Sequence, residues 1–159
     1  MLSENDREIL RLYGRNVRIA REKSGITLGQ LAKESHYSRR RLSTLENGEH
    51  DLKMCNSIKL AEALNVDYPS LFSRNFVDER KYEKRYQPNN FLLIFIKNSK
   101  DHLGKKDKYQ TFFQASVGLD PTTVSNIFTG KTENPLISTL YRMALSIGVD
   151  IENLLRRNN

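Results

Sequence analysis

Residues 26–49 of the chain read ITLGQLAKESHYSRRRLSTLENGE, and this stretch decides the fold. Apolar residues recur in it at spacings of three and four, which is the period of an amphipathic helix. Thr27 and Ser38 each stand just before such a run, where a side-chain oxygen can cap a helix N-terminus. Only a few residues of turn separate the two runs. Two short helices joined in this way predict a helix-turn-helix motif at about residues 27–47.

The rest of the chain, which has 159 residues in all, is also predicted to be helical. Leu, Ala, Ile, Arg, Lys and Glu recur at helical spacings, whereas the alternation typical of strands is nearly absent. Gly and Pro are few and lie between the periodic segments. In the first half the pattern predicts five short helices, at about residues 4–23, 28–35, 39–47, 54–64 and 68–73. The fold class is therefore predicted to be all-α.

A second, weaker copy of the pattern lies in the other half of the chain. YSRRRLSTLENGE is echoed by LDPTTVSNIFTGK, which places Gly130 at the position of Gly48, 82 residues further on. Beyond it, SIKLAEALNVDYPSLF is echoed by TLYRMALSIGVDIENLL, with one extra residue in the intervening loop. The apolar positions agree and the outward positions differ, as expected for two copies of one fold with separate surfaces.

The repeat predicts two tandem five-helix domains joined by a short linker. The predicted boundaries are residues 1–73 for the first domain, 74–90 for the linker and 91–159 for the second domain. The first domain holds its helix-turn-helix motif at about 27–47, and the second holds its motif at about 109–129.

The linker itself is predicted to be helical to about Tyr86. Pro88 is expected to break this helix, because proline removes a backbone N–H and clashes with the preceding turn. Asn89 or Asn90 is then expected to cap the next helix, which would begin at Phe91.

Positive charge points to a polyanionic partner. The chain has 26 Lys and Arg against 19 Asp and Glu, a formal net charge of +7. Such an excess favours nucleic acid, an anionic membrane or an acidic protein. The excess is spread over both halves rather than gathered in a tail, so folded surfaces would carry the binding.

Several other classes of protein are disfavoured. Cys55 is the only cysteine, so neither an internal disulfide nor a two-cysteine zinc site can form. The three histidines, His36, His50 and His102, lack metal-ligand spacing, and we expect neither metal nor cofactor. No apolar run approaches the roughly 20 residues that span a bilayer, and no signal peptide is evident, so we expect a cytoplasmic protein without membrane contact. No catalytic constellation is found, and we expect no enzyme.

The first half of the chain resembles the helix-turn-helix domain of the Cro/C1 repressor class, also called the Xre family. The resemblance rests on ITLGQLAKESHYSRRRLSTLENGE, followed by IKLAEALNVDYPSLF. The resemblance covers about residues 12–72. The second copy, about residues 91–155, is similar but degenerate, with Phe113-Gln114 in place of the family's Leu-Ala and Phe128 in place of its Glu. The resemblance implies two lambda-repressor-like domains and a transcription regulator of double-stranded DNA. It further implies a repressor that acts by operator occupancy, as a homodimer or an internal pseudo-dimer.

The family also implies roles for individual residues. The positions that read base edges are Arg39, Arg40, Ser43 and Thr44. The positions that hold phosphates are Arg21, Thr27, Ser38, Arg41, Asn47, His50 and Lys53. Arg21 and Glu46 occupy the positions of a family ion pair. This pair joins the first helix to the end of the recognition helix, which is the second helix of the motif. The chemistry agrees, because arginine near the start of an exposed helix can bond guanine O6 and N7 in the major groove.

The outward residues of the second copy are compatible with two interpretations of its function. A possible second DNA site consists of Thr122, Thr123, Ser125, Asn126 and Lys131, since Asn can read adenine and Thr can contact bases or phosphates. The uncharged surface and Phe128 favour a domain kept for dimerisation or for binding a protein. The alternative function is therefore a protein-binding inhibitor or antitoxin-like adaptor. Its C-terminal domain, including the apolar FLLIFI run at 91–96, would bind a protein partner while the N-terminal domain autoregulates.

Overall fold

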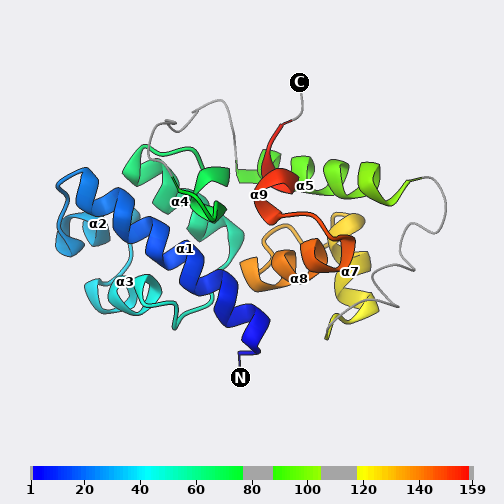
Figure 1. Ribbon diagram of the computed structural model, residues 1–159, viewed down its shortest axis with the longest axis horizontal. Helices are drawn as coiled ribbons and strands as arrows, with labels where there is room; N and C mark the ends of the chain where they lie inside the picture. The colour runs from blue at the N-terminus through cyan, green and yellow to red at the C-terminus, as the bar shows by residue number, and fades with distance from the viewer. Residues whose placement is uncertain (1, 77–87, 105–117, 158–159) are drawn as a thin grey trace.

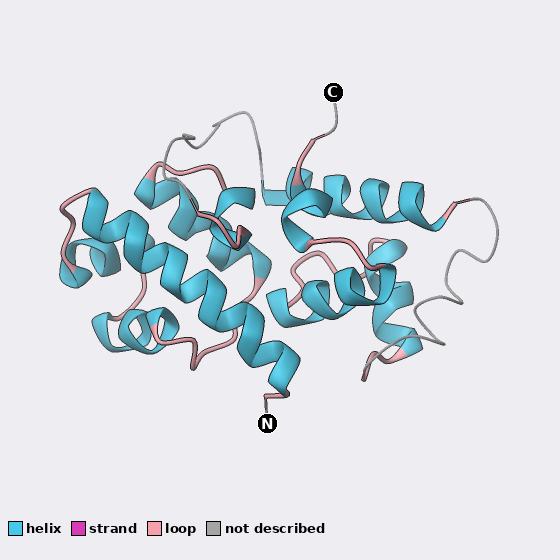
Figure 2. Ribbon diagram, viewed as in Figure 1, coloured by secondary structure: helices cyan, strands magenta, loops and turns pink. Residues whose placement is uncertain are grey.

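The computed structural model describes residues 2–76, 88–104 and 118–157, and within these ranges every regular element is a helix. The first half contains α1 (Glu4–Lys23), α2 (Leu28–Ser35), α3 (Arg39–Glu46), α4 (Met54–Leu64) and the 3₁₀ helix η1 (Pro69–Phe72). The second half contains α5 (Pro88–Leu103), α7 (Pro121–Phe128), α8 (Ile137–Ile147) and α9 (Ile151–Leu155). Figure 1 shows their arrangement, and Figure 2 colours the described residues by secondary structure, with helices in cyan and no strand among them.

The predicted helix starts of the first half are confirmed for the four α-helices, and the caps explain why. Thr27 Oγ1 accepts from the backbone N of Gln30 at 3.1 Å, and Gln30 Oε1 accepts from the backbone N of Thr27 at 2.8 Å. Ser38 Oγ accepts from the backbone N of Arg41 at 3.1 Å. Each bond satisfies an N–H that has no partner inside the helix. The recognition helix ends one residue earlier than predicted, at Glu46.

The predicted start of the next helix is wrong. α5 begins at Pro88, three residues before the predicted Phe91, so the proline opens this helix instead of breaking one. Proline is well suited to a first helical turn, because the N–H that it lacks would have no intrahelical partner there. Residues 74–76, the described start of the predicted linker, are not helical. The rest of the predicted linker helix, up to about Tyr86, lies outside the described residues, as does the first helix of the second motif within 105–117.

Close backbone packing sets α1 against the recognition helix α3. Gly14 lies at the crossing, where an added Cβ would overlap the carbonyl oxygen of Leu45 and lie 2.9 Å from that of Glu46. Next to it, Tyr13 is fully buried and donates its hydroxyl to the carbonyl of Ser57 on α4 at 2.9 Å. The first helix therefore supports both α3 and α4 from one buried face.

The buried apolar side chains of both halves form one continuous cluster. The rings of Tyr68 and Phe91, one from each half, lie 4.8 Å apart at their centroids, which is within the range of favourable aromatic pairs. Tyr68 also packs against Phe72 at 5.3 Å. The halves thus share a core within the described residues, and the tandem two-domain architecture stays a prediction.

Ion pairs also join the halves. Arg142 on α8 donates to both carboxylate oxygens of Asp6 on α1, at 2.9 and 2.6 Å. Arg156 donates to Asp67 at 2.9 Å. Burial opposes ionisation of Asp6, but the hydrogen bonds from Arg142 and Ser3 outweigh it and lower the pKa of Asp6 below its ordinary value of 3.8. The Asp6 carboxylate is therefore stabilised in its charged form in the folded protein.

Asp6→Asn is expected to lower the free energy of unfolding at pH 7 by about 2 kcal/mol, because it leaves Arg142 without its charged partner. The pKa of Asp6 is depressed in the folded state, so its contribution is present above pH 3.8 and is lost as the pH falls through the folded pKa. Urea unfolding at a series of pH values should show the difference in free energy of unfolding between wild type and variant shrinking as the pH falls below 3.8 and through the folded pKa.

Glu4→Gln is the control, because Glu4 is exposed and lies 3.7 Å from its partner Arg11. Glu4→Gln should change the free energy of unfolding little, as is usual when an ion pair at the surface is removed. If the free energy of unfolding of Asp6→Asn stays below that of wild type by a constant amount down to strongly acid pH, the assigned role of the Asp6–Arg142 pair would be contradicted.

Candidate nucleic-acid interface

The recognition helix α3 has one buried and one exposed face. Leu42 and Leu45 are almost completely buried in the core. On the opposite face Arg39, Arg40 and Ser43 are exposed, and Thr44 is half-buried. Among the described residues, no carboxylate lies within ion-pair distance of Arg39 or Arg40, whose guanidinium groups thus remain available to a ligand.

A tight turn sets the angle between α2 and α3. His36 ends α2 in the left-handed region, with φ 61° and ψ 22°. This conformation is uncommon for a residue with a side chain, although His adopts it more readily than a β-branched residue does. The next residue, Tyr37, is half-buried, and the Arg41 guanidinium carbon lies 5.8 Å above its ring. The turn thus directs the start of α3 outward.

Four of the predicted phosphate-binding residues are cap residues of helices. Thr27 precedes α2 and Ser38 precedes α3, and both are exposed while their hydroxyls cap the helices. Asn47 is the C-cap of α3 and is exposed, as is Lys53 just before α4. Their roles toward DNA stay predictions. Helix N-termini attract anions, so the two capped starts are suitable phosphate positions.

Arg41 and His50 lie together. Arg41 Nη2 is 3.1 Å from His50 Nε2. Burial, followed by the charge of Arg41, lowers the pKa of His50 below its ordinary value of 6.5. His50 is therefore neutral at pH 7 and can accept a hydrogen bond from Arg41. Any contact of His50 with a phosphate at this pH would be a hydrogen bond rather than an ion pair.

Arg21 and Glu46 form the ion pair that the resemblance implies. Arg21 Nε donates to Glu46 Oε2 at 2.7 Å and Nη2 donates to Oε1 at 3.1 Å, while Nη1 donates to the carbonyl of Ile26 at 3.1 Å. The hydrogen bond with Glu46 raises the pKa of Arg21, although burial opposes this. All three guanidinium nitrogens thus have protein partners, and Arg21 fixes the end of α3 to α1.

Two arginines that sequence reasoning missed lie beside the end of α3. Arg7 and Arg11 on α1 line a hollow of about 370 Å³ together with Asn47, Gly48 and Glu49 at the end of α3. They lie before residue 12, where the family resemblance begins. Their spacing of four, which places them on one face of a helix, was the available signal.

The exposed face of α7 carries no charged side chain. Thr122 and Ser125 are exposed, and Thr123 and Asn126 are half-buried. Lys131 is exposed just beyond the helix end. Phe128, at the position of Glu46, is buried, with Lys100 Nζ 5.8 Å above its ring. The second predicted DNA site is therefore accessible, but its helix is uncharged.

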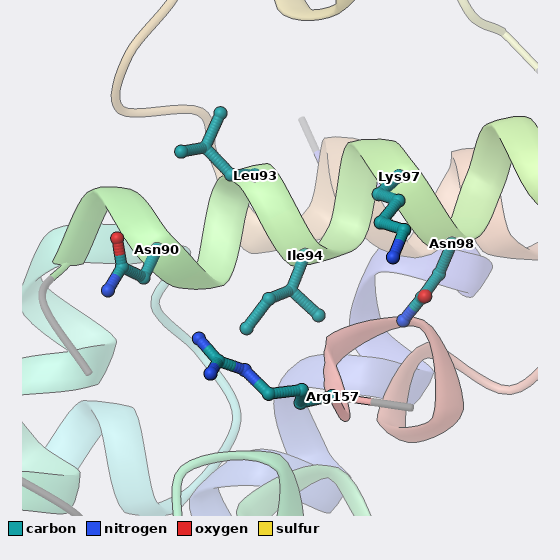
Figure 3. A pocket seen from close by; sticks show the side chains of 6 residues that line it. All are labelled: Asn90, Leu93, Ile94, Lys97, Asn98 and Arg157. Atoms are coloured by element: carbon teal, nitrogen blue, oxygen red, sulfur yellow. The ribbon is translucent and has the colours of Figure 1, made fainter. Parts of the chain in front are cut away.

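The FLLIFI run is buried only in part. Phe91, Leu92 and Phe95 enter the core, whereas Leu93 is 62% exposed. A hollow of about 410 Å³ beside this face is lined by Asn90, Leu93, Ile94, Lys97, Asn98 and Arg157. Figure 3 shows Ile94 and Arg157 facing each other across it while Leu93 points away.

Comparison with known proteins finds one family. Residues 17–71 match the family model described as helix-turn-helix, a range that includes α2 and α3 and extends through most of η1. The match supports the resemblance to Cro/C1-type domains of the Xre family, and it implies double-stranded DNA as a partner. No curated protein and no solved structure matches the chain. Within the described residues, none of the helices has the length and apolar character to cross a membrane.

Proposed function

We propose that the chain is a transcription regulator that binds a specific double-stranded DNA sequence and represses transcription by occupying an operator. The exposed face of α3 is the observation that carries the proposal. Arg39 and Arg40 project from a short helix whose other face is fixed in the core, and they have no carboxylate partner among the described residues. Such a helix fits the major groove, where each base pair presents a distinct pattern of donors and acceptors.

In this mechanism α3 lies in the major groove, and Arg39 and Arg40 donate to guanine O6 and N7. Ser43 and Thr44 contact neighbouring base edges one turn further along. Phosphate contacts at the starts of α2 and α3, together with Lys53, fix the position of the domain on the duplex. The Arg21–Glu46 pair holds α3 against α1, which keeps the reading face rigid. The protein acts by excluding other proteins from the operator and carries out no chemistry.

We further propose that the second half is a degenerate copy of the first. The bounds of α7 equal those of α3 shifted by 82 residues, and the bounds of α8 equal those of α4 shifted by 83. Gly48 and Gly130, one residue past each C-cap, both have positive φ, 75° and 83°. These agreements support an internal pseudo-dimer more directly than a homodimer.

The exposed Leu93 on α5 and the uncharged α7 are the observations that favour the alternative, a protein-binding adaptor. An adaptor of this kind would still carry a DNA-binding first half. The arginine-bearing α3 therefore supports regulation of transcription in either case, and we prefer the simpler proposal.

The test is footprinting of the full chain on the DNA that flanks its own gene, combined with transcription in vitro from the same DNA. A protected site that overlaps the promoter, with less transcript as protein is added, would support repression. Binding no tighter than to unrelated DNA at the same salt concentration would contradict sequence-specific regulation. A rise in transcript with bound protein would contradict the repressor role alone.

A further inference from the structure

We propose that a single chain binds two unlike half-sites of one operator, the first read by α3 and the second by α7. This inference rests on the proposed function and goes beyond it, because it defines the class of DNA that the chain recognises. The operator would be bipartite and non-palindromic, and one chain would cover both parts.

A pair of main-chain hydrogen bonds joins the two halves symmetrically. The backbone N of Met54 donates to the carbonyl of Pro135 at 2.8 Å, and the backbone N of Ile137 donates to the carbonyl of Leu52 at 3.0 Å. Leu52 and Met54 correspond to Pro135 and Ile137 at the repeat offset of 83. Each half thus donates to the other half a main-chain hydrogen bond equivalent to the one that it accepts. This reciprocity is the property of an isologous two-fold contact.

Two hydrogen bonds that side chains accept next to this main-chain pair follow the same two-fold relation. Asp51 accepts a hydrogen bond from the hydroxyl of Ser138, and Asn134 Oδ1 accepts one from the backbone N of Cys55 at 2.8 Å. Asp51 corresponds to Asn134, and Cys55 corresponds to Ser138, at the same offset. A local two-fold axis therefore passes close to the bridged pair Lys53 and Leu136.

Inside each half, a buried asparagine makes an equivalent clamp. Asn16 Nδ2 on α1 donates to the carbonyls of Leu71 and Ser73, at 3.0 and 2.8 Å. Asn98 Nδ2 on α5 donates to the carbonyls of Leu154 and Arg156, also at 3.0 and 2.8 Å. These partners correspond at the repeat offsets, so the first helix of each half is anchored in the same way.

The helices α3 and α7 also end alike. The backbone N of Glu49 donates to the carbonyl of Thr44 at 3.0 Å, and the backbone N of Thr132 donates to the carbonyl of Asn126 at 2.9 Å. In Figure 1, α3 lies towards the left of the molecule and α7 towards the right. Two recognition helices related by a two-fold axis are how dimeric helix-turn-helix proteins meet successive major grooves.

The two reading faces have different chemistry. Arg39, Arg40 and Thr44 of α3 correspond to Pro121, Thr122 and Asn126 of α7. Arginine pairs best with guanine, whereas asparagine pairs best with adenine and the threonine methyl group contacts that of thymine. We therefore assign a guanine-containing half-site to α3 and an A·T-containing half-site to α7.

The test begins with selection of binding sites from a random duplex library by the full chain. The expected result is a motif of two unlike half-sites, with centres about 10 base pairs or a multiple apart. Native mass spectrometry of the complex with the selected duplex should give one chain per duplex.

Substitutions then assign each half-site to its helix. Asn126→Ala should weaken binding to the selected duplex about tenfold, and it should have no further effect once the A·T half-site is scrambled. The slope of affinity against salt concentration should stay unchanged, because this substitution removes no phosphate contact. Asn153→Ala is the matched control, since this exposed asparagine lies on α9, and it should bind as wild type does.

Thermal unfolding of each variant checks that the fold is kept. Thr122→Ala, at an exposed position of α7, gives an independent measurement with the same expected loss. A palindromic motif bound by two chains, or a single half-site that Asn126→Ala binds as wild type does, would overturn this inference and leave the proposed function standing. A selection that yields no motif would instead overturn the proposed function.

Discussion

Replacing Arg39 and Arg40 together by alanine is expected to abolish sequence-specific DNA binding without unfolding the protein. Each bidentate arginine–guanine contact is worth about 1–3 kcal/mol of discrimination, so the double variant should lose at least about thirtyfold in affinity for its operator. Both side chains are exposed, so the free energy of unfolding should change by less than about 0.5 kcal/mol. Fluorescence anisotropy with operator and scrambled duplexes at one salt concentration measures the first effect, and urea unfolding measures the second.

The control removes the same amount of charge elsewhere. Arg18 on α1 and Lys59 on α4 are exposed, and their double alanine variant should lose little preference for the operator over a scrambled duplex. If both double variants lost the preference for the operator over a scrambled duplex to the same extent, only the net charge of the protein would determine DNA binding. Operator affinity of the Arg39 and Arg40 variant within about threefold of wild type would be incompatible with reading by α3.

Gly14→Ala is expected to have the largest effect on stability. The new Cβ would overlap the carbonyl oxygen of Leu45, a backbone atom that cannot rotate away as a side chain would. α1 and α3 must therefore separate, which should lower the free energy of unfolding by about 3 kcal/mol. The displaced α3 should also bind the operator more weakly. Urea unfolding and anisotropy titrations measure the two losses.

Gly29→Ala is the matched control for this variant. Gly29 lies in α2, and an added Cβ there would have only Thr27 Oγ1 within 4 Å, at 3.9 Å. Because alanine favours helix more than glycine does, this variant should be more stable than wild type by about 0.5 kcal/mol. Equal destabilisation by both alanines would mean that close approach of α1 to α3 is not the cause.

Short-range signals made the first half predictable. The Thr27 and Ser38 caps, together with the helical spacing between them, act within three or four residues, and the structure has them as predicted. The prediction that Pro88 breaks a helix is wrong because proline both breaks a helix and begins one, and local sequence does not separate the two. The exposed face of α3 followed from the same periodicity, since its buried leucines fix which side points outward.

Contacts between distant segments could not be predicted in this way. The Asp6–Arg142 pair and the Tyr68–Phe91 contact depend on how the halves pack, which no local pattern specifies. The hollow beside Arg7 and Arg11 has the same origin, because α1 and the end of α3 meet only in the folded chain. The Arg21–Glu46 pair was found only through the family resemblance.

Dimethyl sulfate protection of the operator most directly tests whether α3 reads base edges. The reagent methylates guanine N7 in the major groove, the atom that Arg39 and Arg40 are proposed to contact. The account predicts that wild type protects specific guanines and that Arg40→Ala exposes at least one of them while the rest of the footprint persists at higher protein concentration. A bound complex in which every guanine N7 stays reactive would contradict it.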